Sequence, residues 1–304
     1  MRLEERPDPV PGSEEVLVAA RFAGINTADL AQRAGAYPAP PGAPQDVPGL
    51  EVAGTVVAKG AAVRDFAEGD RVFGLVGGGG LADRVLVHER HATRVPERLS
   101  DEEAAGVPEA FITSHDAIVT RGALGLGDVL LVNGANGGVG SAGVQIGVVA
   151  GARVFASARS AHGQLAELGA EAVLPDDAVA AVQAAGGADV VLELVGAPNV
   201  DRNLDALATK GRIVVVGTGA GTDADLSLRK LMHKRATIHG TVLRARPLEE
   251  KAAAVQAFAH EVVPHLASGR MRAIVDRVFP VEEAADAFDH MAGSGKFGKV
   301  LLAF

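Results

Sequence analysis

The chain has 304 residues, of which 48% are hydrophobic and 22% charged, so it can bury one large core or two ordinary ones. Its formal net charge of −9 argues against nucleic-acid binding, which needs clustered lysine and arginine. There is no cysteine, which excludes disulfides, cysteine-ligated zinc and thiol catalysis. No apolar stretch approaches a membrane helix in length, and the start MRLEERPDPVPG does not resemble a signal peptide. We expect a cytoplasmic protein whose partners include neither membrane nor nucleic acid.

Residues 1 to about 110 contain short strand-like segments. Apolar and β-branched residues recur over residues 15–24, 52–60, 70–76 and 83–89, and glycine and proline separate these runs. This pattern predicts a small barrel or sandwich. Near Ser100 the sequence SDEEAAGVPEAF is typical of the start of a helix.

From Val129 onward, apolar strands alternate with helical segments. The runs VLLV, ARVFAS, VVLELVG and RIVVVGTG predict strands, and helices are predicted at residues 141–149, 163–168, 200–208 and 226–234. Such alternation is typical of an α/β fold with a doubly wound parallel sheet buried on both faces. The tail predicts one long helix over residues 247–268, then a strand, a helix and the closing strand KVLLAF.

The sequence VLLVNGANGGVGSAGVQIG, residues 129–147, runs from an apolar strand through four glycines into a helix. Glycines there let the backbone turn sharply and approach a pyrophosphate, which the N-terminus of the helix attracts. A second strand follows at the distance of a βαβ unit, so the pattern predicts a dinucleotide site. The alternative is a glycine-rich turn that only packs the helix against the strand.

The end of the second strand bears on the choice between NAD and NADP. An acidic residue there would bind the adenosine ribose of NAD, but residues 154–163 read VFASARSAHG and contain none. The segment offers Ser157, Arg159 and Ser160 instead, and a guanidinium with hydroxyls suits a 2′-phosphate. The sequence therefore favours NADPH as the cofactor. The alternative is that Arg159 is a solvated surface residue and the site is indifferent.

Five segments carry a family resemblance: GINTADLAQRAGAYPAPPGAPQDVPGLEVAGTV from residue 24, AAGVPEAFITSHDAI from 104, VLLVNGANGGVGSAGVQI from 129, KRATIHGTVLRARPLEEKA from 234 and GKFGKVLL from 295. With these motifs the chain resembles the zinc-independent, zeta-crystallin-like quinone oxidoreductases of the medium-chain dehydrogenase/reductase superfamily. The stress-inducible NAD(P)H quinone oxidoreductase branch is the most similar.

The resemblance implies two domains. A β-rich, GroES-like catalytic domain would comprise residues 1–110 and 244–304, lacking the first strands that the family usually has. A Rossmann domain that binds NADP would comprise residues 111–243, with the active site in the cleft between the two. The resemblance also implies a homodimer through the Rossmann edge strand at residues 237–243, TIHGTVL, since an apolar edge strand needs covering.

The implied reaction is hydride transfer from C4 of NADPH to a quinone without a metal, because a quinone is already a good hydride acceptor. The residues at the family's catalytic positions are Asn26, Asp29 and Tyr37, and Tyr37, Asn26 or an ordered water would donate a hydrogen bond to the developing oxyanion. The cofactor-binding positions are Thr113 (in the AFITS turn), Asn136, Gly137, Gly138, Val139, Gly140, Ser157, Arg159, Ser160, Gly217, Thr218, Leu243, Arg244 and Lys296.

Each assignment has a simpler alternative. Asn26 and Thr113 could cap a turn or a helix, Asp29 could be an acid in the first turn of a helix, and Tyr37 could pack in a turn. Arg244 and Lys296 could be solvated or pair with acids. No metal ligand set is predicted, because His88 and His91 have no evident third partner and read as a chance surface pair.

Two departures from the family bear on the ligands. The segment LGAEAVLPDD has Leu174 and Pro175 where the family usually has a tyrosine that packs on the adenosine, and Leu81 replaces a common aromatic on the substrate wall. Two other functions therefore stay open: an NADPH-dependent enone or enoyl reductase of a biosynthetic pathway, and a non-catalytic NADPH-binding protein. A pure binder would have no need of Asn26, Asp29 and Tyr37.

Overall fold

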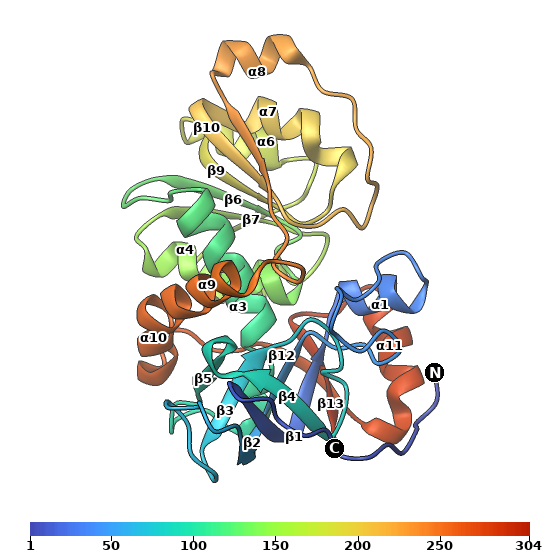
Figure 1. Cartoon of the computed structure of the whole chain (residues 1–304). Coiled ribbons are helices and arrows are strands. Elements are labelled where there is room, and N and C mark those ends of the chain that lie inside the picture. The colour runs from blue at the N-terminus through green and yellow to red at the C-terminus, as the bar shows by residue number, and fades with distance from the viewer. The chain divides into compact units, whose positions relative to one another are not determined.

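The computed structural model describes residues 1–304. The chain forms two compact units, which are described one at a time (Figure 1). Met1–Ile112 and Leu243–Phe304 together form the split unit, which contains both ends of the chain. Thr113–Val242 form the central unit. No helix is both long enough and apolar enough to cross a bilayer.

The split unit is built on a seven-stranded sheet. Its strands lie in the order β12 (Val275–Pro280), β13 (Lys299–Ala303), β1 (Glu15–Ile25), β2 (Glu51–Lys59), β3 (Arg71–Leu75), β5 (Ala92–Arg94), and β4 (Arg84–His88) also pairs with β1. Strands β12 and β13 are parallel, whereas β1 is antiparallel to β2, β4 and β13. Because side chains alternate along a strand, Val16, Val18 and Ala20 of β1 enter one core. The pairing of β1 with β13 brings residues from the two ends of the chain into one sheet.

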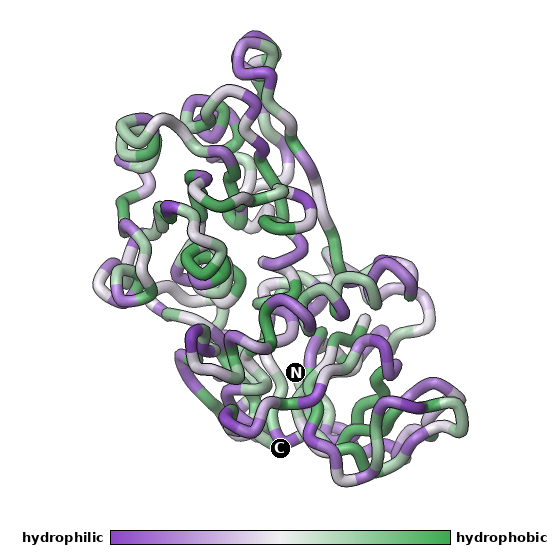
Figure 2. The backbone as a smooth tube through the Cα atoms, turned by 90° about the vertical axis from the view of Figure 1, so that its left-hand side faces the viewer, coloured by the Kyte–Doolittle hydropathy of each residue, from purple (hydrophilic) through white to green (hydrophobic).

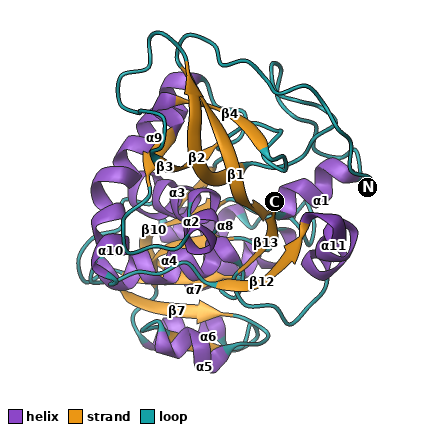
Figure 3. Ribbon diagram, turned by 90° about the horizontal axis from the view of Figure 1, so that it is seen from below, coloured by secondary structure: helices purple, strands orange, loops and turns teal.

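Helices cover this sheet and join its strands. They are α1 (Thr27–Arg33), α2 (Asp101–Ala105), α9 (Leu248–Glu261), α10 (Val263–Ser268) and α11 (Ala284–Ala292), with single 3₁₀ turns at Glu89–His91 and Val281–Glu283. Figure 3 shows α11 beside β12 and β13, where Phe288 joins the core formed with Phe279 and Val300. On the other side of the sheet, Phe258 of α9 packs edge-to-face on Phe73 of β3, with the ring centroids 6.0 Å apart.

Two local predictions fare differently. The helix start at Ser100 is confirmed: its hydroxyl accepts from the backbone N–H of Glu103, whose carboxylate accepts in turn from the N–H of Ser100. The single helix predicted over residues 247–268 is wrong. The chain breaks at Val262 between α9 and α10, because Pro264 has no N–H to continue the hydrogen-bond ladder and suits the first turn of a new helix.

The central unit is a six-stranded parallel sheet. Its order is β11 (Thr237–Gly240), β10 (Leu207–Val215), β9 (Ala188–Glu193), β6 (Val129–Asn133), β7 (Arg153–Ser157), β8 (Glu171–Val173). The connecting helices are α4 (Gly138–Val149), α5 (His162–Glu167), α6 (Ala178–Ala184), α7 (Val200–Ala206) and α8 (Leu228–Lys234), with a 3₁₀ turn at Ala197–Asn199. The predicted doubly wound sheet is confirmed, and the strand order reverses at β6 and β9, where such folds bind ligands at the carboxyl edge.

Successive side chains of the central strands point to alternate faces of the sheet, and both faces are buried. Leu131, Val191 and Ile213 belong to a core that α6, α7 and α8 cover. Leu130 and Leu192 point to the opposite face, where they lie against Gly147 and Gly143 of α4. Figure 2 shows hydrophobic stretches of the trace separated by hydrophilic ones.

Helix α3 (Pro108–His115) connects the units in sequence and continues into a π-helical turn, Asp116–Arg121. Asp116 is buried within this turn, where its carboxylate accepts from the hydroxyl of Thr241 at 3.3 Å and lies 3.6 Å from the guanidinium of Arg121. The π-helical turn is thus fixed to the residue that follows β11.

Candidate functional site

The glycine-rich loop joins β6 to α4 at the carboxyl edge of the central sheet. Gly137 is the residue before the helix; its backbone is extended, and no side chain caps the helix there. The first turn of α4 contains no acidic residue. A twelve-residue helix that begins without a cap or an acid presents its N–H groups and positive dipole end to an anion. Asn136, Gly138 and Val139, only partly buried, lie at this helix start.

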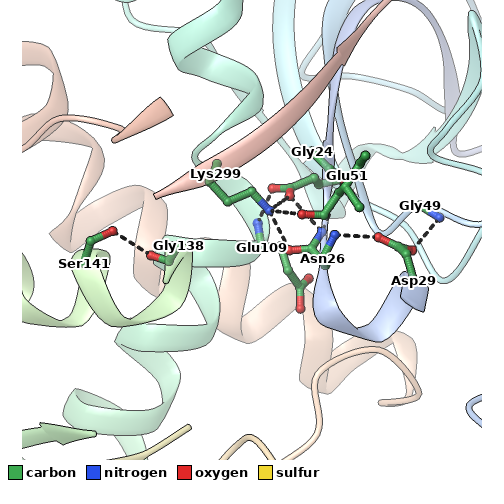
Figure 4. A network of polar contacts seen from close by, with 10 residues as sticks. Gly24, Asn26, Asp29, Gly49, Glu51, Glu109, Gly138, Ser141 and Lys299 are labelled. Carbon is green, nitrogen blue, oxygen red and sulfur yellow. Dashed lines mark hydrogen bonds and ion pairs between the residues drawn. The ribbon is translucent and has the colours of Figure 1, made fainter. Parts of the chain in front are cut away.

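Gly140 explains why a glycine is needed inside the first turn of α4. A Cβ at this position would lie 2.6 Å from Cα of Ala135 and would collide with the carbonyl oxygen of Gly134. The helix therefore approaches the loop closely only because residue 140 has no side chain. The hydroxyl of Ser141 donates to the carbonyl of Gly138 at 3.1 Å and reinforces the same turn (Figure 4). These residues fit the pyrophosphate of a dinucleotide.

The adenosine end of the predicted site follows β7. Ser157 is buried, and its carbonyl oxygen accepts from the backbone N–H groups of Gly134 and Ala135 at 3.0 and 3.1 Å, which ties β7 to the glycine loop. Arg159 is exposed and has no acidic partner, and Ser160 is half-buried. A cation and a hydroxyl are thus placed at the end of the second strand without a competing carboxylate, an arrangement that fits a 2′-phosphate.

A buried carboxylate, Glu193, organises the neighbouring loops of the same edge. Glu193 ends β9 and is 0% exposed. One of its oxygens accepts from the backbone N–H groups of Val195 and Gly196 at 2.6 and 2.8 Å. The other accepts from the side-chain amides of Asn133 and Asn203 at 2.8 and 2.7 Å. A carboxylate so fully hydrogen-bonded can stay buried, and it fixes the ends of β6 and β9 together.

The loop after β10 is attached to the same residue. The carbonyl oxygen of Glu193 accepts from Val216 and Gly217 at 2.9 and 3.1 Å. Gly217 follows the strand in a partly buried position, and Thr218 is exposed beyond it. The two residues predicted to contact the cofactor from this loop therefore share the carboxyl edge with the glycine loop.

Thr113 differs from its prediction in local structure. The segment AFITS is helical, since the N–H of Phe111 bonds to the carbonyl of Val107 and Thr113 lies inside α3. The predicted turn is wrong because Pro108 suits the first turn of a helix and no glycine follows to end it. Thr113 is the first residue of the central unit and is 8% exposed.

In the split unit, Asn26 and Asp29 form the start of α1. The carboxylate of Asp29 accepts from the backbone N–H of Asn26 and from the N–H of Gly49, both at 2.8 Å (Figure 4). Asp29 therefore joins α1 to the end of the long loop before β2. Burial raises the pKa of Asp29 to about 6, although the two N–H groups oppose this shift by stabilising the charged form.

The side chain of Asn26 belongs to a buried ion pair that residue patterns do not predict. Lys299 of β13 donates to Oε1 of Glu51 at 2.5 Å and to Oδ1 of Asn26 at 2.6 Å. The Asn26 amide donates to the same Glu51 oxygen at 2.9 Å and to the carbonyl of Gly24 at 3.3 Å (Figure 4). Both amide hydrogens of Asn26 are thus engaged inside the split unit.

Gly24 allows this pair to form across β1. A Cβ at residue 24 would collide with the carboxylate of Glu51 and would lie 2.9 Å from Cε of Lys299. The other oxygen of Glu51 accepts from the backbone N–H of Glu109 at 2.8 Å, at the start of α3. Lys299 is 4% exposed and Glu51 is 0% exposed, so protein encloses the ion pair.

Glu109 is a second acid that the sequence analysis does not single out. Burial raises its pKa to about 7, and the negative charge of Glu51 adds to the shift, while Lys299 opposes it. A carboxyl group with such a pKa changes its charge near neutral pH, as groups at functional sites often do. Its signal in the sequence is weak: a single acid directly after Pro108.

Tyr37 lies in the irregular segment between α1 and β2 and is half-buried. Burial raises the pKa of its phenol, and the charge of Arg244 opposes the rise, so Tyr37 is protonated at neutral pH. The guanidinium of Arg244 lies 5.0 Å from the centroid of the Tyr37 ring. The structure thus brings together two residues that are far apart in sequence, one predicted as catalytic and one as a cofactor ligand.

The remaining predicted positions lie in the C-terminal part of the split unit. Leu243, its first residue, is 7% exposed and directly precedes Arg244. Lys296 lies in the turn before β13, where its ammonium group donates to the carbonyl of Gly293 at 2.6 Å. Lys296 therefore helps to close this turn.

Metal-binding geometry is absent from the described chain. No group of three or more histidine or acidic side chains is arranged to hold a metal ion. The rings of His88 and His91 lie 5.3 Å apart, and Glu14 is 3.8 Å from His88.

Comparison with known proteins identifies both units. Residues 12–97 match the model of the alcohol dehydrogenase GroES-like domain, and residues 138–260 match that of the zinc-binding dehydrogenases. The quinone oxidoreductase of Mus musculus is 32% identical over 306 residues, covering 97% of this chain and 90% of that protein. The chain belongs to the quinone oxidoreductase family of the medium-chain dehydrogenase/reductase superfamily. It is an oxidoreductase with a GroES-like domain and a Rossmann domain.

Two further relatives bear on the reaction of this quinone oxidoreductase family member. The structure of the quinone oxidoreductase from Thermus thermophilus, described with its NADPH complex, is 34% identical with a TM-score of 0.86 and covers 100% of this chain and 96% of that one. The polyketide synthase GfsB of Streptomyces halstedii is 34% identical over 297 residues, which is 95% of this chain and 5% of that protein.

Proposed function

We propose that the protein is an NADPH-dependent quinone oxidoreductase that transfers a hydride to a quinone without a metal. The observation that carries this proposal is the similarity to quinone oxidoreductases over almost the whole chain, both units included. The glycine loop, with its uncapped helix start, supports the nucleotide part of the proposal. The absence of cysteine agrees with a reaction that does not use cysteine-ligated zinc.

The residues of the central unit would hold NADPH in three places. Gly137 to Gly140 would bind the pyrophosphate, and Ser157, Arg159 and Ser160 would bind the 2′-phosphate. Gly217 and Thr218 would lie beside the ribose and nicotinamide. When bound, NADPH supplies the hydride from C4 of its nicotinamide. The protein supplies orientation and exclusion of water.

In the split unit, Tyr37 is the candidate hydrogen-bond donor to the quinone oxygen. Its phenol is protonated because burial raises its pKa, so it can donate to an oxygen that gains negative charge. Asn26 is a less suitable donor, since both hydrogens of its amide are already donated to Glu51 and Gly24. We propose that Asn26 and Asp29 instead shape the start of α1; the segment that contains Tyr37 follows the other end of this helix.

The preference for NADPH is tested by Arg159→Ala. Loss of one charge-assisted hydrogen bond should weaken NADPH binding by about 1–3 kcal/mol and leave NADH binding unchanged. Arg229→Ala removes a different exposed arginine of the central unit and is the matched control. Titration of nucleotide fluorescence measures both affinities. Equal weakening of NADPH and NADH would contradict the assignment of Arg159 to the 2′-phosphate.

The acceptor is tested by steady-state assays with NADPH and two acceptor classes. Reduction of 9,10-phenanthrenequinone but not of enones is the result expected of a quinone reductase, and Tyr37→Phe should lower its turnover. An unchanged rate in Tyr37→Phe would leave Tyr37 with a packing role alone. Tight NADPH binding without turnover of any acceptor would show a non-catalytic NADPH-binding protein instead.

A second candidate function is an NADPH-dependent reductase of enones or enoyl thioesters. The similarity to the polyketide synthase GfsB favours it, because such a relative points to a biosynthetic acceptor. The nucleotide site would be unchanged, and only the residues that contact the acceptor would differ. Turnover of enoyl thioesters in place of quinones in the same assay would establish this alternative.

We also propose a homodimer formed through residues 237–243. Strand β11 pairs with β10 on one side and is the edge of the central sheet, and Val242 beyond it is 54% exposed. An unpaired apolar edge is covered when a second copy pairs with it. Light scattering should show a dimer in the native protein and a monomer in Val242→Lys. A monomeric native protein would refute this interface.

A further inference from the structure

Arg244 is a buried arginine, with 5% of its surface exposed. Its Nε donates to the carbonyl oxygen of Gly77 at 2.7 Å, and Nη1 donates to the carbonyl of Tyr37 at 3.0 Å. Nη2 donates to Oε1 of Gln32, at the end of α1. Every nitrogen of the guanidinium therefore has a partner in a different segment of the split unit.

The same guanidinium also packs on the ring of Tyr37, 5.0 Å from its centroid. Arg244 thus holds the main chain of Tyr37 by a hydrogen bond and its aromatic ring by a cation–π contact. Only a planar group with several donors can do both at once. A lysine at this position would keep the charge but lose the fork of hydrogen bonds.

The segment that contains Tyr37 has no regular structure to hold it. Residues 35–50 form neither helix nor strand. A long irregular segment stays in place only through side-chain contacts, and such segments often carry function. Gln32, one partner of Arg244, also donates to the carbonyl of Gln45 at 3.0 Å, which extends the support to the far part of the segment.

The main chain of Arg244 is itself held by a lysine of α9. Lys251, in α9, donates to the carbonyl oxygen of Arg244 at 2.8 Å and is 6% exposed. The helix therefore anchors the main chain of residue 244, while the guanidinium reaches into the Tyr37 segment. The three nitrogens of the guanidinium are thus engaged with protein acceptors.

We propose that Arg244 is a positioning residue that fixes the phenol of Tyr37 for the acceptor and that it does not bind the cofactor. This inference rests on the proposed function, in which Tyr37 donates to the acceptor. It changes the role that the family resemblance implies for Arg244, which is that of a cofactor-binding residue. The charge and shape of Arg244 would then act on the reaction only through Tyr37.

The first test is spectroscopic and needs no substrate. Tyr37 is the chain's one tyrosine and there is no tryptophan, so tyrosine fluorescence reports on this ring alone. Acrylamide should quench it more strongly in both Arg244→Gln and Arg244→Lys than in the native protein. Gln32→Met removes one acceptor of the fork and should give a smaller change in the same direction. Arg270→Gln, an exposed arginine of the same unit, should change nothing.

The second test separates acceptor from cofactor. In Arg244→Gln, kcat/KM for 9,10-phenanthrenequinone should fall by about tenfold to a hundredfold, the scale of a misplaced catalytic group. The Kd for NADPH, measured by nucleotide fluorescence, should not change. In a Tyr37→Phe background the same substitution should cause little further loss, because the two residues act as one unit.

The outcomes are distinguishable. Unchanged quenching in both Arg244 variants, or a rise in the Kd for NADPH that matches the loss of kcat/KM, overturns the positioning role. If the losses of kcat/KM in Arg244→Gln and Tyr37→Phe are fully additive in the double variant, the positioning role is overturned as well. If Arg244→Gln does not fold, the quenching and kinetics of Gln32→Met decide the question. A native protein that reduces no quinone refutes the proposed function, whereas the quenching result still tests whether Arg244 holds Tyr37.

Discussion

Replacing Lys299 with methionine tests the buried ion pair of the split unit. Methionine keeps most of the side-chain volume but removes the ammonium group that donates to Glu51, Asn26 and the carbonyl of Ile25. Glu51 would keep the N–H of Glu109 and the Asn26 amide as donors, but it would lose its cation while fully buried. Leaving such a charge uncompensated costs about 3–5 kcal/mol.

A double variant tests the same reasoning. Adding Glu51→Gln to Lys299→Met removes the charge at every pH. The double variant should therefore be more stable than the single one at about pH 8, by about 1–3 kcal/mol.

Urea unfolding followed by circular dichroism measures these differences. Lys210→Met, which alters an exposed lysine, is the control and should be close to the native protein. A loss below about 1 kcal/mol in Lys299→Met would refute the reasoning. So would a double variant that is as unstable as the single one at about pH 8.

Three further predictions concern two acids, Glu109 and Glu193, and the close approach at Gly24. Glu109 has a pKa of about 7 in the folded protein against 4.5 for the free group, so the folded state loses stability as pH rises between these values. Glu109→Gln should thus be more stable than the native protein at about pH 8, by on the order of 3 kcal/mol, and equally stable below about pH 4. Urea unfolding measures the difference, and the control Glu97→Gln, at an exposed position, should show no such pH dependence. Gly24→Ala should lower the free energy of unfolding by about 1–3 kcal/mol, because the added methyl group overpacks against the buried ion pair. Gly219→Ala, with open space around it, should leave the stability unchanged. Equal urea midpoints for the two variants would contradict the close approach at Gly24. Glu193→Gln puts an NH2 donor in place of one carboxylate oxygen, where all the partners of the carboxylate are themselves donors. The variant should therefore lower thermal stability and NADPH affinity together, and an unchanged Kd for NADPH would show that these loops do not shape the nucleotide site.

The fold could be predicted where the signal is local. Alternating apolar strands and helices over residues 129–240 indicate a parallel sheet, because burial on both faces demands continuous apolar strands. The glycine loop is readable for the same reason, since a strand, a turn and a helix follow one another within twenty residues or so. Pro264 is also a local signal for the break between α9 and α10, because a proline inside a helical pattern ends or restarts the helix.

The site could be predicted in its residues but not in its contacts. Glu51 and Lys299 stand in apolar runs, and a charge in such a run signals a buried partner without saying which one. Their separation of 248 positions places that choice beyond any local pattern. Glu193 is a similar case, since VVLELVG shows the acid but not the amides and N–H groups that surround it. Arg244 could be assigned to the cofactor-binding positions but not to the Tyr37 segment, because two of its three hydrogen-bond partners are backbone carbonyls.

The shared sheet of the split unit has a consequence for the order in which the protein is assembled during synthesis. The central unit is one continuous segment and can fold as soon as residue 242 has left the ribosome. The first 112 residues cannot complete their sheet at that stage, because β1 acquires its partner β13 and Glu51 acquires Lys299 only after residues 299–303 emerge. Until then Glu51 lacks the cation Lys299, and Phe22–Ile25 of β1 lack their partner strand, although β4 already pairs with Glu15–Ala19. We therefore expect the N-terminal segment to be the part that nascent chains expose to chaperones and proteases, and its closure over a long loop to limit the rate of folding.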